Sequence, residues 1–274
     1  MIAFLNGRFV AEREAVVSVF DRSFLYGDGL FETMAATDGR VRHLALHLAR
    51  LEVGCRRLGI PMPSPGLLEE ECGRVLEGLG NGTVKLIVTR GPGPRSYRPP
   101  AEPTVTRIVT SAAPRARGDA LTPIVVRLCQ VRLGQNPLLA GLKHLNRLEQ
   151  VMASAEWDDP AIAEGLMLSM DGRLVCATAA NVFLVAGGRL LTPAIRDCGV
   201  SGVMRQVVLT AAGELGIPVG IEDLRPEILD TADEVFVTNA VAGIRPVGEL
   251  MGVRKWPVGE ITKSLVAATT GASA

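Results

Sequence analysis

Two segments near the start of the chain alternate apolar and polar residues around a turn-forming dipeptide. The first, Ile2 to Val10, is centred on Asn6-Gly7, and the second pairs Leu30 to Thr37 with Arg40 to His43 around Asp38-Gly39. Both dipeptides accept the positive φ angles that a tight hairpin turn requires. The pattern therefore predicts two β-hairpins.

Three further segments place apolar residues at the spacing of an α-helix. Leucines recur on one helical face from Leu44 to Leu58. A second run, Leu67 to Leu79, follows Ser64-Pro65, and a proline at the first helical position is typical of a helix start. The third expected helix extends from about Gly202 to Leu215. Helices mixed with hairpins indicate an α/β fold.

The remaining apolar runs have the length of β-strands. We expect these strands at Thr83–Arg90, Thr104–Ser111, Pro123–Leu133, Ala163–Ser169, Arg173–Ala177, Asn181–Val185, Gly188–Leu191 and Glu234–Thr238. Hairpin turns outnumber strand–helix–strand crossovers along the chain, so most of the strand pairing should be antiparallel.

A polar, proline-containing connector, APRARGD at residues 113–119, is the clearest domain boundary. We therefore expect an N-terminal α/β domain at residues 1–112, a linker at 113–122 and a larger C-terminal domain at 123–274.

The composition narrows the class of protein. The 274 residues carry no formal net charge, which excludes the long-range basic field of a protein that binds nucleic acid or an anionic membrane. The five cysteines are an odd number without a CxxC pair, which favours reduced thiols in a cytoplasmic protein over a disulfide framework. The start of the chain turns polar after a few residues, unlike a signal peptide, and no apolar run approaches the roughly 18 residues of a membrane helix.

Common catalytic and metal-binding motifs are absent from the sequence. There is no GxSxG elbow, no GxxxxGK[ST] loop and no GxGxxG between a strand and a helix. His43 and His47 lie one helical turn apart, but no HExxH glutamate lies between them, and Arg42 and Arg50 would repel a cation. A metal site is therefore not expected.

One lysine has an unusual setting. The chain has only four lysines among 29 basic residues, and Lys143 lies between the apolar run Pro137 to Leu142 and an amphipathic run that continues to about Trp157. We expect this amphipathic run to be helical. Unlike arginine, a desolvated lysine can lose its proton and attack a carbonyl. The same spacing also fits a surface lysine at the foot of a helix, so the spacing leaves both interpretations open.

Two segments could offer backbone N–H groups to a phosphate. Ser201 to Met204 opens the third predicted helix, and Asn239-Ala240 follows the last predicted strand. The N-terminus of a helix binds anions readily, although most such ends carry only a capping serine. An aldehyde cofactor with a phosphate group would account for these two segments and for Lys143 together.

Seven motifs occur in order between Tyr26 and Val247: YGDGLFET, HLARL, RGPGPRSY, VRLGQNPLLAGLKHLNRLEQ, AANVF, SGVMRQ and IRPV. Together they resemble the class IV (fold type IV) pyridoxal-phosphate enzymes, which include branched-chain and D-amino acid aminotransferases and 4-amino-4-deoxychorismate lyases. The central block with KHLNRLEQ is similar to that of the lyases, which release pyruvate and leave 4-aminobenzoate for folate biosynthesis. The resemblance implies a two-domain α/β (α+β) homodimer with pyridoxal 5'-phosphate in the interdomain cleft.

The resemblance also implies roles for individual residues. In the C-terminal domain Lys143 would form the Schiff base with the cofactor, and the hydroxyl of Thr33 would lie close to that bond. The cofactor phosphate would be bound by Arg50 and by the backbone amides of Val203, Met204, Asn239 and Ala240. Substrate carboxylates would be bound by Arg95, Tyr97 and, additionally, Arg107, and these arginine and tyrosine loops can reach across a dimer.

One position departs from the family pattern. Related enzymes have a glutamate where this chain has Cys176, and that carboxylate keeps the pyridine nitrogen of the cofactor protonated. A thiol keeps this nitrogen protonated poorly. That is easier to reconcile with a lyase than with a transaminase, because the product of the lyase gains aromaticity. Two alternatives stay open: an aminotransferase for branched-chain or D-amino acids, and a cofactor-poor member that serves as a binding protein.

Overall fold

The structure, a computed structural model, describes residues 2–114 and 119–271, and the contacts among its residues divide the chain into two compact units. Unit 1 comprises Met1–Ala116 and Leu142–Asn146, and unit 2 comprises Arg117–Gly141 and Arg147–Ala274. The predicted connector at 113–119 lies in part outside the described residues. The segment that carries Lys143 was expected in the C-terminal domain, but it packs with unit 1 because its backbone pairs with a strand of that unit.

Unit 1 is built on a six-stranded antiparallel sheet in the order β2-β1-β6-β5-β3-β4. Its strands are β1 (Ile2–Leu5), β2 (Arg8–Ala11), β3 (Gly29–Thr37), β4 (Arg40–Val41), β5 (Gly82–Thr89) and β6 (Thr106–Ala112). Both predicted hairpins are confirmed, with Leu5 opposite Arg8 and Thr37 opposite Arg40.

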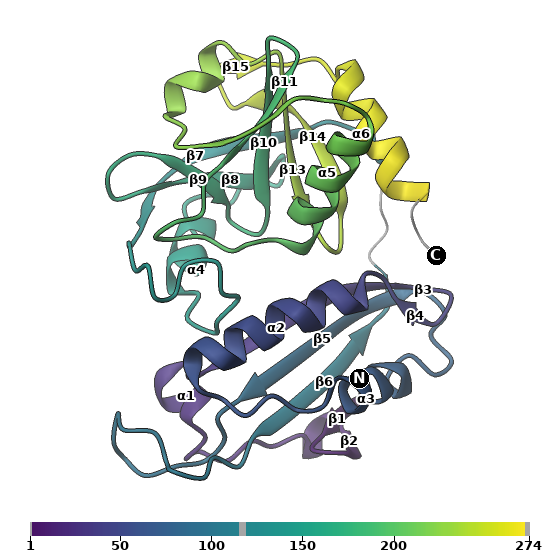
Figure 1. Cartoon of the computed structure of the whole chain (residues 1–274), viewed down its shortest axis with the longest axis vertical. Coiled ribbons are helices and arrows are strands. Elements are labelled where there is room, and N and C mark those ends of the chain that lie inside the picture. The colour runs from purple at the N-terminus through teal and green to yellow at the C-terminus, as the bar shows by residue number, and fades with distance from the viewer. Residues whose placement is uncertain (1, 115–118, 272–274) are drawn as a thin grey trace. The chain divides into compact units, whose positions relative to one another are not determined.

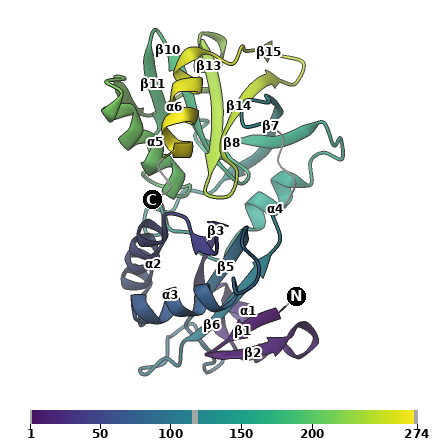
Figure 2. The same ribbon diagram turned by 90° about the vertical axis from the view of Figure 1, so that its right-hand side faces the viewer.

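Two helices, α2 (Leu44–Leu58) and α3 (Pro65–Arg74), cover one face of this sheet (Figures 1 and 2). α2 has the predicted bounds, because Gly59 adopts a φ of 66° and ends it. α3 begins at the predicted proline but ends at Arg74, earlier than expected. The short helices η1 (Glu12–Glu14) and α1 (Arg22–Tyr26) complete the unit.

Unit 2 is built on a nine-stranded sheet in the order β12-β11-β10-β13-β14-β7-β8-β9, with β15 paired to β14. Its strands are β7 (Ile124–Leu133), β8 (Ile162–Ser169), β9 (Leu174–Ala177), β10 (Asn181–Ala186), β11 (Arg189–Pro193), β12 (Val219–Glu222), β13 (Glu234–Asn239), β14 (Gly243–Leu250) and β15 (Arg254–Lys255). The expected antiparallel bias is confirmed, and the parallel pairs are β11–β12, β14–β7 and β7–β8.

The sheet of unit 2 curls around an apolar core. β9, at one end, contacts β10 and β11, and Leu174 forms an isolated bridge with Leu224. On the opposite face, α5 (Val203–Glu214) and α6 (Glu260–Gly271) pack side by side over the stacked rings of Phe183 and Phe236 (Figure 1). The 3-10 helix η2 (Pro226–Asp230) lies between β12 and β13 along the chain.

The helix that follows Lys143 is shorter than expected. α4 (Leu148–Ser154) begins only after residue 147, because residues 142–146 are extended against unit 1 rather than helical. Among the residues that the structure describes, no helix is long and apolar enough to cross a membrane.

Candidate active site

Lys143 is held by its backbone along the edge of β3. Its carbonyl accepts a hydrogen bond from the N–H of Phe31 at 3.0 Å, and the N–H of Leu145 donates to the carbonyl of Gly29 at 3.0 Å. His144 and Leu30 form the antiparallel bridge between these two bonds. The lysine backbone is therefore fixed on both sides.

The amine of Lys143 lies over an aromatic ring on one face of the sheet. Its Nζ is 4.3 Å from the centroid of Phe31, and the Nζ of Lys85 is 5.5 Å from the same centroid. Thr33 is directly opposite Lys85 in the β3–β5 register. Because side chains alternate along a strand, Phe31, Thr33 and Lys85 share this face with the lysine amine.

Lys85 was not among the predicted site residues. Lys255 and Lys263 form ion pairs with Glu249 and Glu260, whereas Lys85 forms none with any described residue. The rarity of lysine in the sequence was the available signal, but only the strand register shows that two of the four lysines meet at one ring.

Arg50, the predicted phosphate ligand, is a residue of α2 and bonds to Glu32 on the opposite face of β3. Glu32, which is 1% exposed, accepts a 2.6 Å bond from Nδ1 of His47 and a 2.8 Å bond from Nε of Arg50. Burial raises the pKa of Glu32, but these bonds outweigh it and hold the pKa below its usual value. Arg50 therefore belongs to a charged network on the α2 side of β3, whereas Lys143 lies on the other side.

The predicted substrate residues Arg95 and Tyr97 lie in the exposed segment between β5 and β6. Tyr97 is 86% exposed, and its ring lies 5.4 Å from that of Tyr26. Among the described residues, Arg95 has no acidic partner. Both side chains are therefore open to a ligand.

Arg107, the additional carboxylate partner proposed from the sequence, is not brought together with Lys143. Its guanidinium forms a two-pronged ion pair with the buried Glu71 of α3, with Nη2 and Oε1 2.8 Å apart. Arg107 also pairs in register with Val88, whose side chain is in the core beneath the helices. The structure thus gives Arg107 a contact that holds α3 on the sheet.

Cys176 lies on β9 in unit 2, opposite Met167 of β8 and inside a buried cluster that also contains Cys129 and Cys198. Burial, with a smaller contribution from Cys198, raises the pKa of its thiol to about 12. Near neutral pH Cys176 is therefore an uncharged thiol, and it cannot replace a carboxylate as a negative partner.

A buried carboxyl group, that of Glu164, lies close to Cys176 and was not predicted from the sequence. Glu164 of β8 accepts hydrogen bonds from the hydroxyl of Thr178 and from the N–H of Ala179, the latter at 3.1 Å. Burial raises its pKa against the effect of these bonds. A glutamate inside the apolar run AEGLMLS was the signal that could have revealed it.

The predicted phosphate segments meet at one turn of unit 2. α5 begins after Gly202, an N-cap residue that makes no side-chain cap hydrogen bond. A β-carbon on Gly202 would lie 1.9 Å from Oδ1 of Asn181, so the glycine permits the close approach. Asn239 donates from Nδ2 to the carbonyl of Ala179 at 3.3 Å. Residues 179–181 therefore connect the start of α5 with the end of β13.

These two segments present backbone N–H groups in different ways. The first turn of α5 directs the N–H groups of Val203 and Met204 along the helix axis, where the helix dipole favours an anion. The side chain of Asn239 accepts from the N–H groups of Val241 and Ala242 at 3.0 and 2.7 Å, which shapes the turn around Ala240. The donor set suits a phosphate. Among the described residues, no group of three potential metal ligands exists.

Known proteins resemble the chain over nearly its whole length. The family model for class IV amino-transferases matches residues 29–250. The chain is 38% identical to a putative branched-chain-amino-acid aminotransferase of Methanocaldococcus jannaschii, over 97% of this chain and 94% of that one. It is 34% identical to an aminodeoxychorismate lyase of Vibrio harveyi, over 91% and 94%. The crystal structure of 4-amino-4-deoxychorismate lyase from Pseudomonas aeruginosa matches with a TM-score of 0.90 and 48% identity, over 96% of each chain.

The chain belongs to the class IV aminotransferase family, which the model matches over most of its length. This confirms the predicted fold class and the predicted cofactor, because the family consists of pyridoxal-phosphate enzymes. Both lyases and aminotransferases are among its relatives, so individual residues distinguish the two reactions.

Proposed function

We propose that this protein is a pyridoxal-phosphate-dependent lyase that converts 4-amino-4-deoxychorismate to 4-aminobenzoate and pyruvate, a step of folate biosynthesis. The similarity to two lyases, one 48% identical over 96% of the chain, supports this reaction. The observation that carries the choice between lyase and transaminase is the uncharged, buried thiol of Cys176.

The donor set of the chain fits the cofactor. Lys143 offers an amine beside an aromatic ring, which suits an aldehyde. In unit 2, the N–H groups of Val203 and Met204 at the start of α5 and the turn at Asn239-Ala240 suit a phosphate, and in unit 1 so does the guanidinium of Arg50. When bound, pyridoxal phosphate supplies an aldehyde that takes up the substrate amine and a ring that accepts electrons.

Lys143 then acts as the base. Once the substrate amine has displaced it, the Lys143 amine removes the proton from the ring carbon that bears nitrogen. The enol-ether side chain leaves as pyruvate after a proton is delivered to it, by Lys143 or through the hydroxyl of Thr33 on the same face. Loss of the side chain makes the remaining ring aromatic, which supplies most of the driving force.

The cations of unit 1 suit the two carboxylates of this substrate. Arg95 and Tyr97 are exposed and open, and we include them as carboxylate ligands. Lys85 is added here because its ammonium shares the Phe31 ring with Lys143 and has no acidic partner among the described residues. Arg107 is left out because it lies on the face of the sheet that α3 covers, where it pairs with Glu71, and not on the face that carries the Lys143 amine.

The thiol of Cys176 favours a lyase for an electronic reason. A transaminase must hold negative charge on the cofactor ring between two proton transfers, and a protonated pyridine nitrogen makes this possible. A neutral thiol cannot keep that nitrogen protonated as a carboxylate does. The lyase reaction depends less on the ring, because its product gains aromaticity.

A class IV aminotransferase acting on branched-chain or D-amino acids is the second candidate. Its support is the 38% identity to a putative branched-chain-amino-acid aminotransferase. Such an enzyme converts its cofactor to the amine form when it is given an amino donor alone, which the lyase does not require.

We also propose that the protein is a cytoplasmic homodimer. All five free cysteines are buried, as expected of a chain in a reducing compartment; they are Cys55, Cys72, Cys129, Cys176 and Cys198. Sedimentation of the purified protein measures the oligomeric state directly, and a monomer at micromolar concentration contradicts this part.

The test of the proposed function is a product assay on the holoenzyme. Purified protein with bound cofactor is given 4-amino-4-deoxychorismate, and both 4-aminobenzoate and pyruvate are measured. Formation of the two in equal amounts is expected. Absence of both from protein whose cofactor absorbance is intact overturns the lyase, and absence of any bound cofactor points to a binding protein instead.

A further inference from the structure

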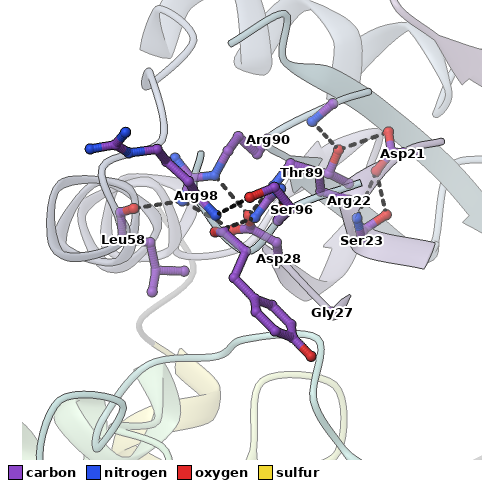
Figure 3. Close-up of polar contacts among 12 residues, drawn as sticks. Asp21, Arg22, Ser23, Gly27, Asp28, Leu58, Thr89, Arg90, Ser96 and Arg98 are labelled. Atoms are coloured by element: carbon purple, nitrogen blue, oxygen red, sulfur yellow. Dashed lines mark hydrogen bonds and ion pairs between the residues drawn. The ribbon is translucent and has the colours of Figure 1, made fainter. Parts of the chain in front are cut away.

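The segment that carries Arg95 and Tyr97 has few ties to the rest of unit 1. Among the described residues, only two hydrogen bonds connect residues 94–103 with the remainder of the chain. Both are donated by the guanidinium of Arg22, from Nη1 to the carbonyl of Ser96 at 2.6 Å and from Nη2 to the carbonyl of Tyr97 at 3.0 Å (Figure 3). One side chain therefore accounts for the position of this backbone.

Arg22 is itself fixed from several sides. It is 3% exposed, and its Nε donates to Oδ2 of Asp28 at 2.8 Å. Its guanidinium carbon lies 4.9 Å from the ring centroid of Tyr26, which in turn contacts Tyr97. A β-carbon on Gly93 would lie 3.0 Å from Cδ of Arg22, so the glycine admits the arginine stem at the base of the loop.

The carboxylate of Asp28 is shared with a second buried arginine. Arg90, 5% exposed, donates from Nε and Nη2 to the two oxygens of Asp28 at 2.7 and 3.0 Å. At the end of α2, it also donates to the carbonyl of Leu58 at 2.7 Å (Figure 3) and to that of Gly59 at 2.7 Å. Arg22 and Arg90 thus have the same anchor and similar burial, but they hold different parts of the backbone.

We propose that Arg22 is a positioning residue for substrate recognition, which holds the loop at residues 94–98 so that Arg95 and Tyr97 can bind a carboxylate of the substrate. This inference rests on the proposed function for the identity of the ligand, but not for the contact itself. The planar guanidinium with its several N–H donors is needed, because one group has to reach Asp28 and two successive carbonyls at once. A lysine at position 22 keeps the charge but loses this geometry.

The first arm of the test needs neither cofactor nor substrate. Trypsin cleaves after arginine, and the Arg95–Ser96 bond lies next to a carbonyl held by Arg22, whereas Arg98 precedes proline and resists cleavage. We expect Arg22→Lys to raise the cleavage rate at Arg95 roughly tenfold, since proteolysis follows the population of the open loop. The matched control is Arg90→Lys, for which we expect less than about a twofold change. Equal rates in the wild type and Arg22→Lys overturn the proposal.

The second arm uses the holoenzyme and 4-amino-4-deoxychorismate. We expect Arg22→Lys to raise KM roughly tenfold, the effect of losing one charge-assisted hydrogen bond, with kcat and cofactor absorbance nearly unchanged. Arg95→Met should raise KM similarly without loosening the loop, and Arg90→Lys should leave KM unchanged. A loosened loop with unchanged KM overturns the positioning role. If the wild type makes no product, the lyase fails and the trypsin arm alone decides whether Arg22 holds the loop.

A milder variant keeps the proposal testable if Arg22→Lys does not fold. Gly93→Ala places a methyl group against the stem of Arg22 and leaves both buried charges in place. We expect roughly threefold faster cleavage at Arg95 and a similar increase in KM from this smaller displacement. No change in either quantity contradicts the role of Arg22.

Discussion

Two carboxylates of unit 1 and a thiol of unit 2 differ in how the protein surrounds a desolvated ionisable group. In unit 1, the buried Glu32 and the half-buried Asp28 are each bonded to cations, and their pKa values stay low although burial opposes this. In unit 2, the position at which related enzymes have a glutamate carries Cys176, a thiol in an apolar cluster with a pKa near 12. Unit 1 therefore maintains fixed charges, whereas this part of unit 2 stays neutral.

The contrast explains how one family can host two reactions. In the proposed function, the charges of unit 1 serve binding: Arg50 would bind the phosphate, and Arg22 supports the loop with Arg95 and Tyr97. The group that sets the electronics of the cofactor ring is in unit 2. A change of charge at Cys176 is therefore expected to alter the reaction, and a change of charge in unit 1 to alter affinity and stability.

Loss of the Lys143 amine should have the largest effect. We expect Lys143→Ala to lower turnover by at least roughly a thousandfold, since it removes both the attachment of the cofactor and the base. The measurement is steady-state formation of 4-aminobenzoate, together with the visible absorbance of the lysine-bound cofactor. Lys255→Ala, which removes an exposed lysine paired with Glu249, is the control and should behave as the wild type.

The charged side of the comparison is tested at Asp28. Asp28→Asn leaves Arg22 and Arg90 buried without a charged partner, which should lower the free energy of unfolding by about 3–5 kcal/mol. Denaturant unfolding measures this difference. Asp171→Asn removes an exposed partner of Arg173 and should cost much less than Asp28→Asn. Equal losses in the two variants contradict the importance of burial here.

The pH dependence of stability gives a second test of the charged carboxylates of unit 1, at Glu32. A lowered native pKa means that the stabilisation is present above the unfolded value of about 4.3 and is lost as pH falls below it. We expect Glu32→Gln to be about 3 kcal/mol less stable than the wild type at pH 7. The difference should narrow below about pH 4, as measured by denaturant unfolding at each pH. A constant gap from pH 7 to pH 3 contradicts this.

The neutral side is tested at Cys176. Cys176→Glu should increase the conversion of the cofactor to its amine form by an amino donor, roughly tenfold, because a carboxylate can keep the pyridine nitrogen protonated. Cys176→Gln has a similar size without the charge and should not increase it. If both variants respond alike, the size of the side chain, not its charge, controls the reaction.

Much of the fold could be predicted from local patterns. The turn residues Asn6-Gly7 and Asp38-Gly39 predict the two hairpins. The leucine spacing, which ends at Gly59, predicts the bounds of α2. The segment after Lys143 could not be predicted in this way. Residues 142–146 pair with β3, and this tertiary pairing overrides the amphipathic pattern that suggested a continuous helix.

Only those residues of the candidate site that belong to sequence motifs could be predicted. Lys143 and the start of α5 were named from the sequence. Lys85, Glu164 and Arg22 were not, because their significance depends on strand register and on contacts between residues far apart in the chain. Arg107 shows the converse, since its position in the sequence suited a substrate ligand until the structure paired it with Glu71.

The most direct test of the central claim follows the cofactor and both products in one reaction. Holoenzyme at a known concentration is given 4-amino-4-deoxychorismate, and 4-aminobenzoate, pyruvate and cofactor absorbance are recorded together. We expect many equivalents of both products in equal amounts while the lysine-bound cofactor absorbance persists. One equivalent or less of product, with the cofactor left in its amine form, would contradict a lyase whose ring is served by an uncharged thiol.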